Sequence, residues 1–352
     1  MRIWESNIRK VVPYVPGEQP DKENMIKLNT NENPYPPAPG VRKIMDEFKE
    51  DTLRLYPDPC AGMLVKEIAN YYKLKPEQVF VGVGSDDVLA MAFMTFFQSK
   101  KPILFPEITY SFYDVWAELF NIPYVRCSLA DDFSFVIDDY KRENGGIIFP
   151  NPNAPTGLCE RLETIEKIIK YNQDVIVIVD EAYIDFGGES ALSLLDKYEN
   201  LLVVQTFSKS RSMAGVRIGF AMGSPTLIKY LNDVKYSFNS YTLNRFSLEI
   251  GVEAIRDEVY FKSVNEKIIS TRERVKNELL QLGFTFPDSK TNFVFATHEK
   301  YNAKDIFLAL KENNIYVRYF DKPKIHNYLR ITIGTDEEMD ALLDFLKHYI
   351  GK

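Results

Sequence analysis

The sequence has few of the residues that build disulfides and metal sites. Its 352 residues include only three cysteines, which lie far apart without a Cys-x-x-Cys pair: Cys60, Cys127 and Cys159. An odd, scattered set excludes a disulfide scaffold and fits a reducing compartment. The three histidines all lie late in the chain, and no group of His, Cys and carboxylate residues has metal-ligand spacing. We therefore expect a cytoplasmic protein without a metal site.

Long hydrophobic runs and a strong charge of either sign are also missing. No apolar segment approaches the ~18 residues of a membrane helix, and Met1–Glu5 contains no apolar core of a signal peptide. The net charge of −7 argues against a nucleic-acid partner. The rest of the composition, 45% hydrophobic and 26% charged, is that of a soluble globular protein with room for two domains. We expect neither a membrane nor a nucleic acid as partner.

Residues 1–40 are rich in proline and asparagine, as in Pro34-Tyr35-Pro36-Pro37. Prolines this dense exclude a regular helix, so the segment is expected to be an extended arm. Residues 41–240 alternate helices with short apolar strands, at 79–84, 102–105, 124–127, 146–149, 175–179, 201–204 and 217–222. Continuous apolar strands are typical of a sheet buried on both faces. The pattern predicts a large, doubly wound, mostly parallel α/β domain.

Residues 241–352 have a different pattern. Helical periodicity covers 243–282, and strands at 293–295, 315–318 and 329–333 are separated by helices. This predicts a smaller C-terminal α+β domain on which the arm packs.

One lysine, Lys209, directly follows the buried strand at 201–204 and stands beside Ser208. Desolvation at such a position lowers the pKa of an amine and makes it a nucleophile toward a carbonyl. Ser208 and the downstream Arg217 suit a phosphate. Together they favour pyridoxal phosphate, an aldehyde cofactor that carries a phosphate. A surface Ser-Lys-Ser turn is the alternative that this stretch alone leaves open.

Other polar groups lie where the predicted strands end. In an open parallel sheet, ligands bind beyond the carboxyl ends of the strands. The groups at this edge are Gly84-Ser85-Asp86, Tyr110, residues 151–157, residues 180–183, Ser208-Lys209 and, just before the last strand, Arg217. Their convergence favours a single site over a series of unrelated turns.

Each group has a functional and an ordinary interpretation. Ser85 and Asp86 place backbone N–H groups at a helix start, which favours a phosphate but is also a usual helix cap. Asp180 ends the most buried strand, where a carboxylate is costly unless paired; a protonated pyridine nitrogen suits it, and a turn cap is the alternative. Tyr183 suits a hydrogen bond to the ring's phenolic oxygen and Tyr110 suits stacking on the ring, or both are core tyrosines.

With these residues in hand, the chain resembles the fold-type-I, pyridoxal-phosphate-dependent aminotransferases of class I/II, and among them the histidinol-phosphate branch. The resemblance covers nearly the full length. It is carried by Pro13-Tyr14-Val15-Pro16-Gly17, the stretch 28–34, Tyr56-Pro57-Asp58-Pro59, Gly84-Ser85-Asp86, the stretch 152–157, Asp180-Glu181-Ala182-Tyr183, Phe207-Ser208-Lys209 with the stretch 215–219, and the stretch 328–334.

The resemblance implies a role for each site residue. Lys209 would form a Schiff base with the cofactor aldehyde and then move the proton between the substrate carbon and C4′ of the cofactor. Asp180 would pair with the pyridine nitrogen, Tyr183 would bond O3′ and Tyr110 would stack on the ring. The cofactor phosphate would be surrounded by Ser85, Asp86, Ser208 and Arg217.

The resemblance also implies a homodimer with shared active sites. Tyr56, in the Tyr-Pro-Asp-Pro turn, would reach the cofactor phosphate of the neighbouring subunit, and the arm would pack on that subunit as well as on the small domain. Arg330 would hold the anionic end of the substrate, because a guanidinium binds phosphate or carboxylate bidentately. Tyr14 and Arg318 would line the same pocket.

The sequence departs from the family at one position. The asparagine that usually precedes Pro-Thr-Gly and bonds O3′ is Ala154 here, and Asn153 stands before it. Either Asn153 reaches O3′ through a small backbone adjustment, or Tyr183 carries that bond alone.

The expected reaction is the transamination of L-histidinol phosphate with 2-oxoglutarate to imidazole-acetol phosphate and glutamate. The alternatives are an aromatic-amino-acid aminotransferase, a threonine-phosphate decarboxylase, and a non-enzymatic regulator that keeps the fold and binds the cofactor. The presence of both Lys209 and Asp180 argues against the regulator.

Overall fold

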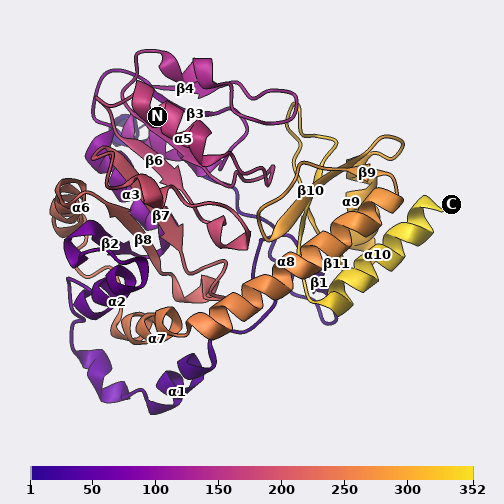
Figure 1. Cartoon of the computed structure of the whole chain (residues 1–352), viewed down its shortest axis with the longest axis horizontal. Coiled ribbons are helices and arrows are strands. Elements are labelled where there is room, and N and C mark those ends of the chain that lie inside the picture. The colour runs from indigo at the N-terminus through magenta and orange to yellow at the C-terminus, as the bar shows by residue number, and fades with distance from the viewer. Residues whose placement is uncertain (1, 352) are drawn as a thin grey trace.

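The largest feature of the chain is a seven-stranded sheet with the order β2-β8-β7-β6-β5-β3-β4. It is seen in a computed structural model that describes residues 2–351 (Figure 1). Its strands are β2 (Val79–Gly82), β3 (Ile103–Pro106), β4 (Tyr124–Cys127), β5 (Ile147–Pro150), β6 (Val177–Asp180), β7 (Leu201–Thr206) and β8 (Gly219–Gly223). Neighbours from β7 to β4 pair in parallel, whereas β8 is antiparallel to both β7 and β2. The expected mostly parallel α/β sheet is confirmed.

Helices cover both faces of this sheet, because successive residues of a strand point to opposite faces. Ile178 and Leu202 pack with the layer of α3 (Gly84–Phe96), α4 (Phe112–Phe120) and α6 (Pro225–Phe238). Val177 and Leu201 pack with the layer of α2 (Gly62–Tyr72), α5 (Leu162–Tyr171) and α7 (Arg245–Arg256). Helix α1 (Pro39–Glu47) packs on α7. Burial on both faces explains why the strands are apolar throughout.

A second, smaller sheet lies beyond the long helix α8 (Glu258–Gln281), which runs from one body of the chain to the other (Figure 1). The sheet is antiparallel, with the order β12-β13-β10-β9. Its strands are β9 (Phe284–Thr285), β10 (Phe293–His298), β12 (Arg318–Tyr319) and β13 (Leu329–Thr332), and helices α9 (Ala303–Glu312) and α10 (Asp336–Ile350) accompany them. The helical stretch expected at 243–282 is divided at Asp257, whose side chain caps α8. Helix α7, which comes after residue 240, packs on α2 and α1 of the large sheet's helix layer. The domain boundary expected at residue 240 stays a prediction.

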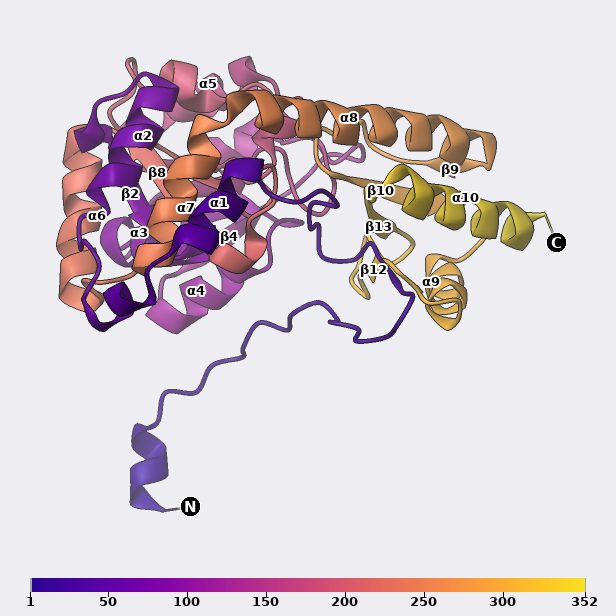
Figure 2. The same cartoon turned by 90° about the horizontal axis from the view of Figure 1, so that it is seen from below.

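The N-terminal arm begins apart from the rest of the molecule and then returns to it. Figure 2 shows its first part, with the short 3-10 helix Ile3–Asn7, projecting away from both bodies. Further on, β1 (Ile26–Lys27) pairs in parallel with β11 (Ile315–Tyr316). The arm is therefore fastened to the C-terminal part of the chain just before residues 29–33.

Neither a metal cluster nor a membrane helix is found in the part of the chain that the structure describes. No three His, Cys, Asp or Glu side chains among residues 2–351 lie together as a metal site would require. None of the helices within the same range is long and apolar enough to cross a membrane.

Candidate active site

The carboxyl edge of the large sheet brings together most of the predicted site residues. Strand β6 ends at Asp180, and β7 ends at Thr206, directly opposite Gly219 at the start of the antiparallel β8. Arg217, before β8, therefore lies at the same edge as Lys209, after β7. One cavity lies at this edge, and we call it the cofactor cavity. It is lined by Ser85, Asp86, Tyr110, Pro150, Ala154, Asp180, Ala182, Tyr183, Thr206, Ser208, Lys209, Ala214 and Arg217.

One end of the cofactor cavity is built for an anion. Helix α3 begins at Gly84, so that unpaired backbone N–H groups face the cavity beside Ser85. Arg217 donates from Nη2 to Oδ2 of Asp86 (3.2 Å), while the Tyr110 hydroxyl donates to Oδ1 (2.8 Å). Gly84 has φ +82°, and a Cβ there would lie 2.5 Å from Nη2 of Arg217, so the close approach of the guanidinium requires glycine.

The cofactor cavity is also lined by a buried carboxylate. Asp180 is 4% exposed, and it accepts hydrogen bonds from the Tyr113 hydroxyl (2.8 Å) and the Ala182 amide (3.3 Å). Burial raises the pKa of Asp180 to about 6, although both hydrogen bonds act to lower it. No Lys, Arg or His among residues 2–351 forms an ion pair with it. A buried carboxylate without a cation suits a cationic ligand group.

Lys209 lines the same cavity. Its Nζ donates to the carbonyl of Thr30 (3.2 Å) and lies 5.8 Å from the centre of the Tyr183 ring. Its own carbonyl accepts from the Asn33 side chain (3.0 Å). The amine is thus held at the cavity by the inner part of the N-terminal arm.

A second cavity, which we call the substrate cavity, adjoins the first and shares Tyr110, Ala154, Tyr183 and Lys209 with it. It is also lined by the three residues predicted to bind substrate, Tyr14, Arg318 and Arg330. Burial lowers the pKa of the Arg330 guanidinium, whose Nη2 donates to the carbonyl of Asn29 (3.1 Å). Its Nε is buried and has no hydrogen-bond partner within residues 2–351.

The charge at the substrate cavity is therefore positive and not neutralised by the chain. Neither Arg318 nor Arg330 is within ion-pair distance of a carboxylate in the part of the chain that the structure describes. Tyr14 is held at the rim by stacking on Phe112, with 4.1 Å between ring centroids. Two unpaired guanidinium groups at one cavity are suited to an anionic ligand.

Two predicted residues lie elsewhere. The Asn153 side chain donates from Nδ2 to the carbonyl of Ile108 (3.0 Å) and lines neither cavity, whereas Ala154 lines both. The geometry thus gives no support to a bond between Asn153 and the cofactor, because the turn directs residue 154 inward. Tyr56 is 79% exposed and lies against Tyr241, away from both cavities of this chain.

Three contacts of the site were not expected from the sequence. They are the Tyr113 hydroxyl on Asp180, the Thr30 carbonyl on Lys209, and the Asn31 side chain on the Tyr183 hydroxyl (2.8 Å). Asn31 belongs to the asparagine-rich stretch 28–34, whose resemblance to the family implies no role for this residue. The only feature of the sequence that points to the Asn31 contact is the high asparagine content of this stretch.

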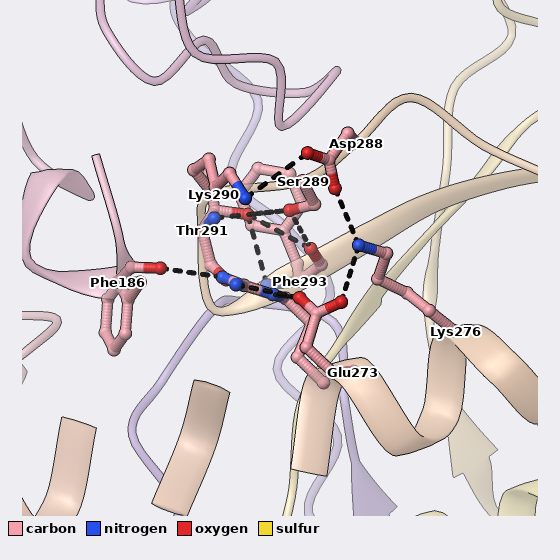
Figure 3. Close-up of polar contacts among 9 residues, drawn as sticks. Phe186, Glu273, Lys276, Asp288, Ser289, Lys290, Thr291 and Phe293 are labelled. Carbon is pink, nitrogen blue, oxygen red and sulfur yellow. Dashed lines mark hydrogen bonds and ion pairs between the residues drawn. The ribbon is translucent and has the colours of Figure 1, made fainter. Parts of the chain in front are cut away.

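A polar network behind Tyr183 joins the two bodies of the chain. Figure 3 shows the loop before β10, in which the Ser289 and Thr291 side chains turn toward the carbonyl of Phe293. The fully buried Arg272 of α8 donates to the carbonyls of Phe186 and Thr291, both at 2.8 Å. The Lys290 amide donates to the carbonyl of Gly157, at the end of the turn that holds Ala154.

This network extends over the surface of α8. Figure 3 shows Lys276 between two carboxylates, Glu273 (2.8 Å) and Asp288 (2.7 Å). Gly157 has φ +78°, and a Cβ there would lie 2.7 Å from Oγ of Ser289. The close contact between the turn and the small sheet therefore depends on glycine.

Comparison with known proteins agrees with this geometry. Residues 23–346 match the model of the family described as aminotransferase class I and II. The chain belongs to this family. It is 54% identical over 99% of its length to a histidinol-phosphate aminotransferase of Lactococcus lactis subsp. cremoris (strain MG1363), of which the match covers 98%. It is also 54% identical over 97% of its length to a histidinol-phosphate aminotransferase of Brachyspira hyodysenteriae (strain ATCC 49526 / WA1), again with 97% of that protein covered.

A solved structure shows the same fold. The histidinol-phosphate aminotransferase of Sinorhizobium meliloti, in complex with pyridoxal 5′-phosphate, superimposes with a TM-score of 0.83 at 22% identity. The match covers 92% of this chain and 90% of that one. The expected fold type I is thereby confirmed. The family to which the present chain belongs depends on pyridoxal phosphate, which is therefore the cofactor of this chain.

The residues of the cofactor cavity fit that cofactor. The buried, cation-free Asp180 suits a protonated ring nitrogen, and the amine of Lys209 lies in the same cavity for the aldehyde. The start of α3 and the Arg217 guanidinium suit the phosphate. All three groups line one cavity, as a ligand with these three functional groups requires.

Proposed function

We propose that the protein transfers the amino group of L-histidinol phosphate to 2-oxoglutarate, yielding imidazole-acetol phosphate and glutamate. The observation that carries the proposal is the pair of unpaired guanidinium groups, Arg318 and Arg330, at a cavity that shares Lys209 with the cofactor cavity. Both amino donors of this reaction, histidinol phosphate and glutamate, carry an anion at one end. One cationic site can therefore receive each in turn.

Each residue of the site has a role that follows from its position. Pyridoxal phosphate, when bound, supplies a conjugated ring that withdraws electrons from the substrate carbon. Asp180 keeps the ring nitrogen protonated, since an ionised carboxylate beside it favours the cation. With the cofactor bound, Lys209 Nζ would take the proton from the substrate carbon and return it to C4′ of the cofactor. Arg330, assisted by Arg318, orients the substrate so that this proton faces the amine.

A half-reaction tests the substrate. The purified protein, loaded with pyridoxal phosphate, is mixed in turn with histidinol phosphate, phenylalanine and threonine phosphate, and the visible absorption band is followed. The proposal expects histidinol phosphate to bleach the band fastest. Faster bleaching by phenylalanine would indicate an aromatic aminotransferase, and release of carbon dioxide from threonine phosphate would indicate a decarboxylase.

We further propose that the protein acts as a homodimer in the cytoplasm. The N-terminal arm, whose first part projects in Figure 2, exposes large apolar side chains, among them Ile3 (91% exposed), Val12 (73%) and Val15 (74%). A second group of exposed apolar side chains includes Leu53 and Leu55, which are close to Tyr56 in the sequence, and Tyr241, which lies against Tyr56. Exposed apolar surface of this extent favours a protein partner, and a second copy of the chain meets the expectation for Tyr56.

Complementation between two inactive variants tests the shared site. Lys209→Ala and Tyr56→Ala subunits are refolded together, so that hybrid dimers form with one site built from the two unmodified residues. Recovery of activity in the mixture, with little in either homodimer, supports the proposal. A monomer by light scattering, or a mixture no more active than its components, would contradict it.

A further inference from the structure

The inner part of the arm contacts the active site through three consecutive residues, each with a different partner. The carbonyl of Asn29 accepts from Arg330, the carbonyl of Thr30 accepts from Lys209, and Nδ2 of Asn31 donates to the hydroxyl of Tyr183. Two of these contacts use backbone atoms, which any residue supplies. The third uses a side chain, and so only Asn31 makes a contact that depends on residue type.

Asn31 is fixed on every side. Its backbone has φ +56°, a left-handed conformation that asparagine tolerates better than most residues. The backbone N–H of Asn31 donates to Oγ1 of Thr332 (3.1 Å), and its backbone carbonyl accepts from Nδ2 of Asn292 (3.0 Å). Asn31 is 1% exposed, Thr332 1% and Asn292 fully buried, so the side chain has no water to exchange with.

The surrounding bonds determine which end of the Asn31 side chain faces Tyr183. The Thr332 hydroxyl already accepts the Asn31 amide, and it donates its own proton to Oδ1 of Asn31 (3.1 Å). Nδ2 then points at Tyr183. The reverse orientation would leave the buried Thr332 proton without an acceptor in this group, and an unmade buried hydrogen bond is unfavourable.

This orientation sets the direction of the tyrosine proton. Because the Tyr183 oxygen accepts from Asn31, its own proton must be donated elsewhere. No acceptor for it exists among residues 2–351, and Tyr183 lines the cofactor cavity. The neighbouring residue Ala154, which also lines that cavity, has no side-chain donor to offer.

We propose that Asn31 is a positioning residue that turns the Tyr183 hydroxyl proton into the cofactor cavity, toward the phenolic oxygen O3′ of pyridoxal phosphate. The inference rests on the proposed function only in requiring that the cofactor binds in this cavity. In chains with an amide at position 154, two donors can share O3′. Here Tyr183 acts without that second donor, so its orientation matters more.

The test follows the visible absorption band of the cofactor-loaded protein against pH. The absorption band changes when the nitrogen that joins Lys209 to the cofactor loses its proton, which leaves the negative charge on O3′ unneutralised. A hydrogen-bond donor to O3′ stabilises this deprotonated form, so loss of the donor moves the midpoint of the titration to higher pH. Asn31→Gly removes the side chain while glycine keeps the positive φ. We expect the midpoint to rise by about one pH unit, the equivalent of a hydrogen bond to a charged group.

Two further variants separate positioning from general damage. Asn24→Gly is the matched control, since Asn24 also has a positive φ (57°) but is exposed and lies far along the arm from the cavity. It should leave the midpoint unchanged. In a Tyr183→Phe background, Asn31→Gly should cause no additional rise, because the hydroxyl that it orients is absent.

The outcomes separate the inference from the proposed function. Introducing Ala154→Asn into the Asn31→Gly protein should lower the midpoint again, because it supplies a new donor. An unshifted midpoint in Asn31→Gly, or an equal shift with and without the Tyr183 hydroxyl, would overturn the inference alone. A wild-type protein that forms no visible band with pyridoxal phosphate would overturn the inference together with the proposed function.

Discussion

Tyr113→Phe tests how the chain keeps Asp180 ionised. The substitution removes one oxygen atom from a fully buried ring and leaves its packing in place. Asp180 then loses the hydrogen bond at Oδ2 and keeps only the Ala182 amide at Oδ1. Because that bond favours the ionised carboxylate, the pKa of Asp180 must rise above its already raised value of about 6.

The size of the effect follows from the hydrogen bond. A bond to a charged group contributes about 1.5–3 kcal/mol, and one pKa unit corresponds to about 1.4 kcal/mol, so the rise is about one to two units. At pH 7 the ionised fraction of Asp180 then falls from about nine-tenths to between about a half and a tenth. Since only the ionised form pairs with the ring nitrogen, the affinity for pyridoxal phosphate falls about two- to tenfold at pH 7.

The assay is the dissociation constant of pyridoxal phosphate at several pH values between 6 and 9, measured after the cofactor has been removed. The dissociation constants of the two proteins should differ most at pH 6, by about five- to fiftyfold, and converge at pH 9, where Asp180 is ionised in both. Tyr316→Phe, at a buried tyrosine of β11, controls for loss of a hydroxyl elsewhere. An affinity loss of the same size at every pH would refute the reasoning.

Three more predictions follow from the site and its surroundings. Lys209→Ala should remove the visible cofactor band and lower activity by at least about 10²–10⁴-fold, the usual contribution of a positioned proton-transfer group. Arg330→Lys should raise KM for histidinol phosphate by about 10- to 100-fold with a smaller change in kcat, because an ammonium group cannot bind the anion bidentately; steady-state kinetics check this. Burial raises the pKa of Glu181 from 4.5 to about 7, so the folded protein holds a proton there that the unfolded chain releases, and stability should fall as pH rises through this window. Urea unfolding at pH 5 and pH 7.5 should show the fall, of roughly 1–3 kcal/mol, and Glu181→Gln should make it smaller, leaving the part that the raised pKa of Asp180 contributes.

The parts of the site that were predicted from the sequence share a simple local signal. Asp180 ends β6 after three apolar residues, and Lys209 comes shortly after β7, which begins with four apolar residues. Such apolar runs can be found without knowing the fold. Arg217 was placed correctly because it precedes the last strand, and the reversal of β8 brings that position to the same edge. Strand order and the parallel sheet then required only the general geometry of α/β proteins.

The parts that were missed depend on contacts between distant segments. Tyr113 reaches Asp180 across 67 residues, and Asn31 reaches Tyr183 across 152. Nothing in the local pattern of α4 or of the arm indicates which side chain turns toward the cavity. Asn153 shows the reverse difficulty: its amide suits a hydrogen bond to the cofactor, but the turn directs its neighbour Ala154 inward and the Asn153 side chain toward the carbonyl of Ile108.

The fastening of the arm has a consequence for synthesis of the chain. Asn31 and its partner Thr332 are 301 residues apart, so a ribosome adding about 5–20 residues per second makes the partner on the order of 15–60 s later. During that interval the large sheet, which ends at Gly223, can form with Lys209 already in place. The residues that hold Lys209, Tyr183 and Arg330 arrive at their positions only after β13 has been made. A chain that stops before residue 315 therefore carries the lysine without the finished site, because it lacks both β11, which pairs with β1, and Thr332, which holds Asn31.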